Sequence, residues 1–274
     1  VALSSKLVET VKQDNIDLMH VHYAIPHAYA GYMAKQMLAA EGIHVPMVTT
    51  LHGTDITLVG NHPDYKPAVT FSINSSDAIT SVSQSLKHET FRHFDVKKDI
   101  HVIPNFIDLE SHKIDSANRC KRNIMANKQE RIITHISNLR PVKRILDIVE
   151  VFDRIQKEIP AKLVIVGEGP DKQAAEDLAT EKGILSKVLF LGKSSEINEI
   201  LSLSDLFILP SEKESFGLAA LEAMASGVPV ISSNAGGLPE VNIHGESGFL
   251  SDVGDVEDMT KNALKILKTE ETLN

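Results

Sequence analysis

The chain has 274 residues, with 28 Lys and Arg against 37 Asp and Glu, which gives a formal net charge of −9. Its 42% hydrophobic and 24% charged residues are typical of globular proteins, and its length suggests two domains. The acidic balance, without a concentrated Lys/Arg stripe, argues against a nucleic-acid partner, and no apolar run reaches the length of a membrane span.

Cysteine content and the first residues of the chain add two expectations. Cys120 is the single cysteine, which excludes an internal disulfide and a cysteine-cluster metal site. We therefore expect a cytoplasmic protein. Whether it forms a homo-oligomer is left open by the sequence. Apolar residues already follow the spacing of a helix face at Leu3, Leu7, Val8 and Val11, so we expect an opening element of the fold to precede them.

Short apolar runs then alternate with segments of helical spacing. In the first part of the chain, the predicted strands are residues 16–21, 46–51, 78–82 and 100–103. The predicted helices between them are residues 28–40, 68–75 and 84–94. The polar, irregular stretch 104–129 marks the boundary, so we predict an N-terminal domain 1–104, a linker 105–130 and a C-terminal domain 131–274.

The second part repeats the pattern. Its predicted strands are residues 132–136, 163–166, 188–191, 206–209 and 228–231, and its clearest helix has one apolar face formed by Ile145, Ile148, Val149, Phe152 and Ile155. Strands without polar alternation, separated by helices, indicate an α/β protein with two doubly wound parallel sheets. We expect the ligand beyond the carboxyl ends of the strands, in a cleft that the two domains face.

The segment 211–222 follows a predicted strand and leads into a helix near Phe216 and Gly217. Free N–H groups at a helix start favour an anion, and two carboxylates, Glu214 and Glu222, bracket this start. Six residues of helix advance about 9 Å, so the pair suits a phosphate with a hydroxyl-bearing group at either end. The alternative is that both glutamates are solvated surface residues.

A second cluster, Arg140 and Lys143, lies in the loop after the strand at 132–136. These cations could bind a diphosphate and stabilise negative charge on a departing nucleotide, although a solvated basic loop would show the same residues. A third group, Tyr23, Thr49 and His52, lies at the carboxyl ends of two strands in the first sheet, from where their side chains would reach the cleft.

Other motifs in the sequence suggest a metal site or a dinucleotide-binding site, but each of them is incomplete. The His20–His22 pair has zinc-ligand spacing but no evident third ligand, so packed histidines are the better interpretation. The Gly167–Gly169 turn resembles a dinucleotide fingerprint, but Lys172 occupies the third glycine position, which disfavours a nicotinamide-dependent dehydrogenase. The glycines at 236–237 and in 245–250 are equally well explained as plain turns or as flexible loops.

Taken together, these motifs resemble the retaining nucleotide-sugar glycosyltransferases of the GT4 grouping. The resemblance is carried by Glu214 with Glu222, by Arg140 with Lys143, and by the segments 104–108, 167–170, 223–229 and 236–240. It implies a GT-B type fold with two Rossmann-like domains and an incomplete N-terminal domain, because family members begin with a strand and a Gly-rich loop. It also implies that no metal ion is required.

The resemblance implies a role for each candidate residue. Arg140 and Lys143 would bind the donor diphosphate, Glu214 the transferred sugar, and Glu222 the ribose. The donor phosphates would lie on backbone amides in the segment Ser215, Phe216, Gly217 and Leu218. Tyr23, Thr49 and His52 would face the acceptor, and His52 and Glu214 would join Arg140 and Lys143 at the reacting centre.

A narrower resemblance, in residues 20–27, 49–56 and 211–217, is to family members that transfer N-acetylglucosamine from UDP-N-acetylglucosamine to the hydroxyl of L-malate in bacillithiol biosynthesis. It implies a nucleotide sugar and a small anionic acceptor as partners. Two alternatives stay open: a family member with another acceptor, and a nucleotide-sugar-binding fragment that is catalytically incomplete.

Overall fold

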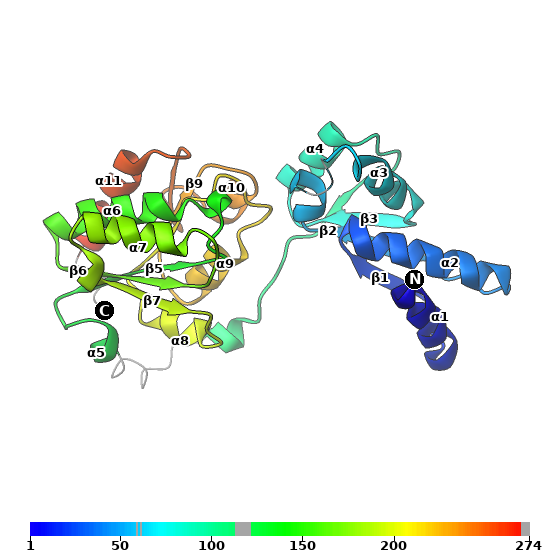
Figure 1. Cartoon of the computed structure of the whole chain (residues 1–274), viewed down its shortest axis with the longest axis horizontal. Helices are drawn as coiled ribbons and strands as arrows, with labels where there is room; N and C mark the ends of the chain where they lie inside the picture. The colour runs from blue at the N-terminus through cyan, green and yellow to red at the C-terminus, as the bar shows by residue number, and fades with distance from the viewer. Residues whose placement is uncertain (59, 61, 113–121, 270–274) are drawn as a thin grey trace. The chain divides into compact units, whose positions relative to one another are not determined.

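The structure is a computed structural model that describes residues 1–58, 60, 62–112 and 122–269. The chain divides into two compact units, Val1–Asn105 (unit 1) and Phe106–Asn274 (unit 2) (Figure 1). Cys120 lies outside the described residues, together with the rest of the stretch 113–121 of the predicted linker. The described part of that linker includes α5 (Arg122–Met125), and the Arg122 guanidinium donates to Asp205 Oδ2 at 2.5 Å, within unit 2.

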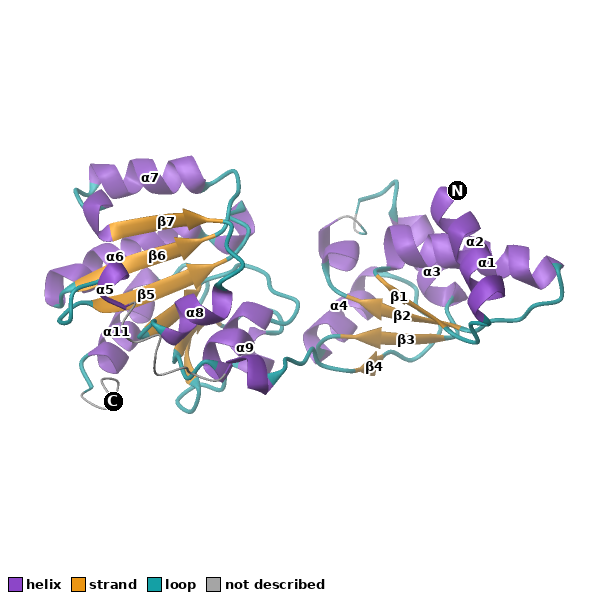
Figure 2. Ribbon diagram, turned by 90° about the horizontal axis from the view of Figure 1, so that it is seen from below, coloured by secondary structure: helices purple, strands orange, loops and turns teal. Residues whose placement is uncertain are grey.

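Unit 1 contains a four-stranded parallel sheet in the order β1-β2-β3-β4. The strands are β1 (Met19–His22), β2 (Met47–Leu51), β3 (Ala78–Ser81) and β4 (His101–Val102). The helices are α1 (Ala2–Asp14), α2 (Tyr29–Ala40), α3 (Lys66–Ser75) and α4 (Gln84–His93). Figure 2 shows α1, α2 and α3 gathered on one side of this sheet, where Met19 and Met47 pack against Val11 and Leu38.

The first strand differs from its prediction in position and in pattern. β1 begins at Met19 rather than at residue 16, because Asn15 takes a left-handed conformation (φ 52°) at the end of α1 and the chain turns through the exposed Ile16 and Leu18. Within β1, Met19 is buried whereas His20 and His22 are exposed. This alternation gives the sheet a face that carries histidines, which the expectation of strands covered on both faces did not include.

Unit 2 contains a six-stranded parallel sheet in the order β10-β9-β8-β5-β6-β7. The strands are β5 (Arg131–Ile136), β6 (Ala161–Val166), β7 (Val188–Gly192), β8 (Leu206–Leu209), β9 (Val230–Ser233) and β10 (Gly248–Ser251). The helices besides α5 are α6 (Ile145–Glu158), α7 (Lys172–Glu181), α8 (Ile197–Ser202), α9 (Leu218–Ala225), α10 (Leu238–Val241) and α11 (Val256–Leu267). The direction of chain progression reverses between the neighbours β5 and β8, so the loops after these two strands flank the switch point of the sheet.

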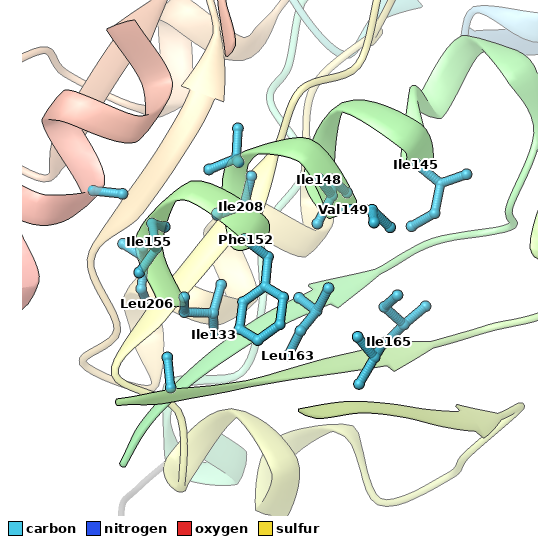
Figure 3. Close-up of a cluster of buried hydrophobic side chains, with 14 of the residues drawn as sticks. Ile133, Ile145, Ile148, Val149, Phe152, Ile155, Leu163, Ile165, Leu206 and Ile208 are labelled. Carbon is cyan, nitrogen blue, oxygen red and sulfur yellow. The ribbon is translucent and has the colours of Figure 1, made fainter. Parts of the chain in front are cut away.

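The core of unit 2 confirms the predicted apolar face of α6. All five residues of that face are fully buried, and Figure 3 shows them packed over Ile133, Leu163, Ile165, Leu206 and Ile208 of the sheet. Burial of this kind contributes about 25 cal/mol for each Å² of apolar surface removed from water. The core therefore holds the carboxyl ends of β5 and β8 in a fixed position.

The edge strand β10 was not predicted. The glycines in residues 245–250 suggest a turn or a loop, but Gly248–Ser251 pairs in parallel with β9. The glycine that suggested a turn is required by the pairing itself, since a Cβ atom at Gly248 would lie 1.9 Å from the carbonyl oxygen of Val230. A glycine inside a strand can mark such a close backbone approach.

Candidate functional site

Two loops of unit 2 meet at the switch point of the sheet. One follows β5 and carries Lys143, and the other follows β8 and carries Glu214. Lys143 Nζ lies 2.5 Å from Glu214 Oε2, and less than a fifth of each side chain is exposed. The backbone also joins the loops, because the N–H of Glu212 donates to the carbonyl of Val142 at 2.8 Å. The structure thus brings together two predicted site residues that are 71 positions apart.

A cavity of about 550 Å³ opens around this ion pair, within the size range of small-molecule sites. Its lining includes five of the predicted donor-binding residues: Lys143, Glu214, Gly217, Leu218 and Glu222. The remaining lining residues are Ile136, Ser137, Asn138, Leu209 and Ala219. Cationic, carboxylate and apolar groups therefore converge on one space.

Helix α9 begins at this cavity, with Gly217 at its N-cap. Gly217 has a φ of 100°, and a Cβ atom there would lie 2.6 Å from Leu238, so the position requires glycine. The first N–H groups of a helix lack partners within the helix and attract an anion. The cavity is lined by residues 217–219, whereas Phe216 is buried away from it and Ser215 does not line it. The predicted anion site is thus formed by a segment that starts two residues later than expected.

The glycine loop at 236–237 packs against the backbone of Glu214. The N–H of Gly237 donates to the carbonyl of Glu214 at 2.8 Å, and a Cβ atom at Gly236 would lie 2.1 Å from the same carbonyl oxygen. The sequence alone could not distinguish this contact from a plain turn. The tertiary structure shows that the loop sets the position of the Glu214 backbone.

Glu222 extends from α9 into the cavity and is half-buried. Burial raises the pKa of its carboxyl above the ordinary value, and the nearby His112 has a smaller, opposite effect. Burying a carboxylate is costly, so a ligand group that donates hydrogen bonds to it would stabilise it. Sugar hydroxyls supply such donors.

Arg140 is not among the residues that line this cavity. It is exposed and lies in extended conformation (φ −105°, ψ 158°) immediately before the short 3₁₀ turn Pro141–Lys143. Lys143 is the last residue of this turn and reaches Glu214 in the loop after β8, whereas Arg140 precedes the turn. Asn138, which sequence reasoning passed over, lines the cavity instead.

A second cluster lies on unit 1, after the ends of β1 and β2. His22 Nδ1 and His52 Nε2 are 2.8 Å apart, and the ring centroids of Tyr23 and His52 are 4.9 Å apart. Burial lowers the pKa of both His22 and His52, and the neighbouring histidines lower each of them further. These imidazoles are therefore neutral at physiological pH and can accept or relay a proton.

Asp55 holds this cluster in shape, a role that the sequence did not reveal. Its carboxylate accepts hydrogen bonds from the backbone N–H groups of Ala24 at 2.7 Å and Gly53 at 2.9 Å. These bonds tie the loop that carries Tyr23 to the loop that carries His52. Tyr23 itself has a φ of 74°, an uncommon conformation for a residue with a side chain, and such strain concentrates at functional sites.

Thr49 does not join the cluster as predicted. Its side chain is fully buried, and its hydroxyl shares a 2.7 Å hydrogen bond with Ser76. Successive side chains of a strand point to opposite faces of the sheet, so the neighbouring Thr50, rather than Thr49, lies on the face that carries the histidines. The Thr50 hydroxyl bonds His20 Nε2 at 2.8 Å.

Two further observations concern only the residues that the structure describes. Among them, no helix is both long and apolar enough to cross a membrane. Within the same residues, no three or more His, Cys, Asp or Glu side chains are arranged to hold a metal ion. His20 and His22 instead bond Thr50 and His52, respectively.

Comparison with known proteins identifies similar sequences along both units. Residues 1–111 match the family described as Glycosyltransferase Family 4, and residues 118–274 match Glycosyl transferases group 1. The N-acetyl-alpha-D-glucosaminyl L-malate synthase of Bacillus anthracis is 46% identical over 98% of this chain and 70% of its own length. An uncharacterized glycosyltransferase of Methanocaldococcus jannaschii is 31% identical, over 86% of this chain and 62% of its own length.

Solved structures show the same fold. Anabaena HepE, crystallised in complex with UDP and glucose, superposes with a TM-score of 0.83 at 22% identity, over 100% of this chain and 74% of its own. The sucrose-phosphate synthase of Thermosynechococcus elongatus has a TM-score of 0.79 at 22% identity, over 98% of this chain and 70% of its own.

Proposed function

The chain belongs to family 4 of the glycosyltransferases, and we propose that it transfers N-acetylglucosamine from UDP-N-acetylglucosamine to the hydroxyl of L-malate. It is a glycosyltransferase enzyme with a Rossmann-like GT-B fold. The choice of substrates rests on its similarity to the malate synthase of Bacillus anthracis, and the product would enter bacillithiol biosynthesis. We also propose a cytoplasmic location, as the single cysteine suggests.

The observation that carries the donor assignment is the Lys143–Glu214 pair beside the start of α9. A cation and helix N–H groups suit a diphosphate, and Glu214 and Glu222 supply acceptors for hydroxyl groups. A nucleotide sugar has this chemistry, because an anionic diphosphate joins two groups that are rich in hydroxyls.

In this proposal, transfer depends on stabilising the departing nucleotide. Lys143 and the first N–H groups of α9 would bind the diphosphate while the bond to the sugar breaks and negative charge grows on the leaving phosphate. Glu214 would exchange its ion pair with Lys143 for a hydroxyl of the transferred sugar. The anomeric configuration would be retained by attack on the same face, and the leaving phosphate would take the proton of the acceptor hydroxyl.

The acceptor would bind near Tyr23 and His52 of unit 1. The neutral His52, hydrogen-bonded to His22, can accept a hydrogen bond from a hydroxyl. Thr49 is omitted from this part of the proposal because its hydroxyl is already bonded to Ser76 in the interior. We propose that no metal ion takes part, since Lys143 and the helix N–H groups supply the positive charge that the diphosphate requires.

The test is a product assay with the complete gene product. We expect incubation with UDP-N-acetylglucosamine and L-malate to yield N-acetylglucosaminyl malate by mass spectrometry, with the donor's α-configuration in the proton NMR spectrum. Addition of EDTA should leave the rate unchanged. Product with another acceptor but none with malate would favour the alternative family activity, and UDP binding without any product would favour a binding module.

A further inference from the structure

His135 is fully buried in β5, immediately before the cavity residues Ile136 and Ser137. Its ring makes two hydrogen bonds: Nδ1 lies 2.9 Å from the carbonyl oxygen of Ile208, and Nε2 lies 2.7 Å from the hydroxyl of Ser137. The ring also stacks on Phe207 at an interplanar angle of 18°. The proposed reaction uses none of these contacts.

The two partners determine which ring nitrogen carries the proton. A carbonyl oxygen can only accept, so Nδ1 must donate to Ile208. Burial lowers the pKa of His135 to about 4, so the ring is neutral at physiological pH and carries a single N–H. Nε2 therefore has a lone pair, and it accepts the hydrogen bond from the Ser137 hydroxyl.

We propose that His135 fixes Ser137 as a hydrogen-bond acceptor in the cavity, so that Ser137 binds an O–H or N–H group of the ligand rather than a phosphate oxygen. The hydroxyl hydrogen of Ser137 is used by His135, which leaves only oxygen lone pairs for the cavity. The identification of the ligand as a nucleotide sugar rests on the proposed function. Ser137 is then a specificity-determining contact, and His135 is its positioning residue.

This assignment divides the polar lining into two kinds of group. Lys143 and the start of α9 donate hydrogen bonds and suit the diphosphate. Ser137, Glu214 and Glu222 accept hydrogen bonds and suit the hydroxyl and amide groups of the sugar or the ribose. Phosphate oxygens carry only lone pairs, so they would be repelled at Ser137.

The first experiment observes the tautomer directly, without any ligand. Long-range ¹H–¹⁵N NMR spectra of the labelled chain, recorded from about pH 5 to about pH 8, report the protonation of each imidazole nitrogen. We expect His135 to stay neutral with its proton on Nδ1 throughout this range. A proton on Nε2, or a ring that becomes charged above pH 6, would overturn the proposal.

The second experiment compares two ligands by titration calorimetry with competition. UDP-N-acetylglucosamine offers hydroxyl and amide donors, whereas symmetric dimethyl diphosphate has the dianionic diphosphate and no donor group. We expect Ser137→Ala to weaken UDP-N-acetylglucosamine binding about tenfold, the effect of one hydrogen bond, and to leave the diphosphate unaffected. Equal weakening of both ligands, or no change in either, would contradict the proposal.

His135→Asn separates the positioning role from a structural one. An asparagine amide occupies the place of Nδ1, so the bond to Ile208 can persist while the Ser137 hydroxyl loses its acceptor. We expect this variant to bind the dimethyl diphosphate at least as well as the wild type and UDP-N-acetylglucosamine less well, because Ser137 can now donate. If the two affinities fall in parallel in His135→Asn, the positioning role is wrong.

Ser202→Ala is the matched control, since the Ser202 hydroxyl bonds its own helix outside the cavity. It should bind both ligands as the wild type does, and thermal unfolding of all variants shows whether they are folded. If the wild type does not bind UDP-N-acetylglucosamine, the proposed function fails. In that case, two results still decide whether the Ser137 hydroxyl accepts hydrogen bonds in the cavity. They are the tautomer of His135 and the effect of Ser137→Ala on diphosphate binding.

Discussion

At the scale of single residues, the candidate site depends on how each charged group is partnered. Lys143 and Glu214 neutralise each other in the cavity, which allows both to be mostly buried. Asp55 is buried too, and burial raises the pKa of its carboxyl although four backbone N–H groups lower it in part. The Asp55 carboxylate is held by its backbone bonds before any ligand binds, which reduces the reorganisation that binding near it requires.

Lys143→Gln tests the leaving-group role. The change removes the cation but keeps most of the side-chain length, so we expect turnover to fall about 10²- to 10³-fold, the usual effect of losing one transition-state contact. The measurement is the steady-state rate of N-acetylglucosaminyl malate formation. The neighbouring exposed Lys213→Gln is the control and should keep its rate. Full turnover in Lys143→Gln would show that the cation is not needed.

Asp55→Asn tests the positioning of the acceptor side. An asparagine side chain has one oxygen acceptor, and its NH2 group cannot accept, so one of the bonds to Ala24 and Gly53 must be lost. We expect faster hydrogen exchange at the Ala24 or the Gly53 amide and a higher KM for malate, with donor binding in unit 2 unchanged. The exposed Asp64→Asn is the control. Unchanged exchange at Ala24 and Gly53 would rule out this role.

His135 predicts a specific dependence of stability on pH. Its pKa falls from 6.5 to about 4 on folding, so the unfolded chain binds the extra proton between these values. The stabilisation from the neutral ring is therefore complete above pH 6.5 and is lost as the pH falls toward 4, by about 3 kcal/mol in all. Urea unfolding across this range should show a difference in slope between the wild type and His135→Asn. Parallel curves would contradict the low pKa.

At the scale of elements, glycine contacts determine where the loops at the switch point can lie. α9 can begin at Leu218 because Gly217 adopts a positive φ, and the loop before it rests on Gly236 and Gly237. Gly237 has a φ of −82°, so its backbone conformation suits any residue. Only the space around it demands glycine, because a Cβ atom there would lie 2.4 Å from the carbonyl oxygen of Ser215.

Gly237→Ala should therefore displace the 211–217 loop and weaken UDP-N-acetylglucosamine binding at least tenfold, with a loss of stability of about 1–3 kcal/mol. Calorimetry and thermal unfolding measure the two effects. Gly183→Ala is a matched control: its φ of 69° adds strain, but nothing lies within 4 Å of the new Cβ atom. It should lose stability without losing affinity. Comparable affinity loss in both variants would point to general destabilisation.

At the scale of the whole molecule, the proposed donor and acceptor groups belong to different folding units. All cavity residues lie in unit 2, whereas Tyr23, His52 and Asp55 lie in unit 1. Each unit has its own parallel sheet and its own buried core. A donor that binds in the cavity should consequently stabilise unit 2.

UDP should therefore slow hydrogen exchange in the loops after β5 and β8 and at the start of α9, and leave strands β1 to β4 unchanged. Mass spectrometry of peptides after exchange measures both units in one sample. The Lys143→Gln variant should lose most of the protection, because its binding site for the diphosphate is weakened. Protection confined to unit 1 would contradict the donor assignment.

Much of the architecture follows from the amino-acid sequence alone. The α6 face, most of the strands, and the choice of Glu214 and Lys143 as separate donor-site candidates could be predicted, because side-chain periodicity and the residues after a strand are local properties. The resemblance of its motifs to family 4 also identified the enzyme class. These features depend on residues that are close together in the chain, so they can be recognised in the amino-acid sequence.

Only the tertiary structure decided which of the candidate side chains share a space. Strand alternation buries Thr49 against Ser76 and leaves Thr50 with His20, and the turn after Asn138 leaves Arg140 outside the cavity. The Ser137 contact with His135, itself bonded to Ile208, depends on how β8 lies beside β5. Packing between distant segments sets such contacts, and residue spacing carries no direct record of it.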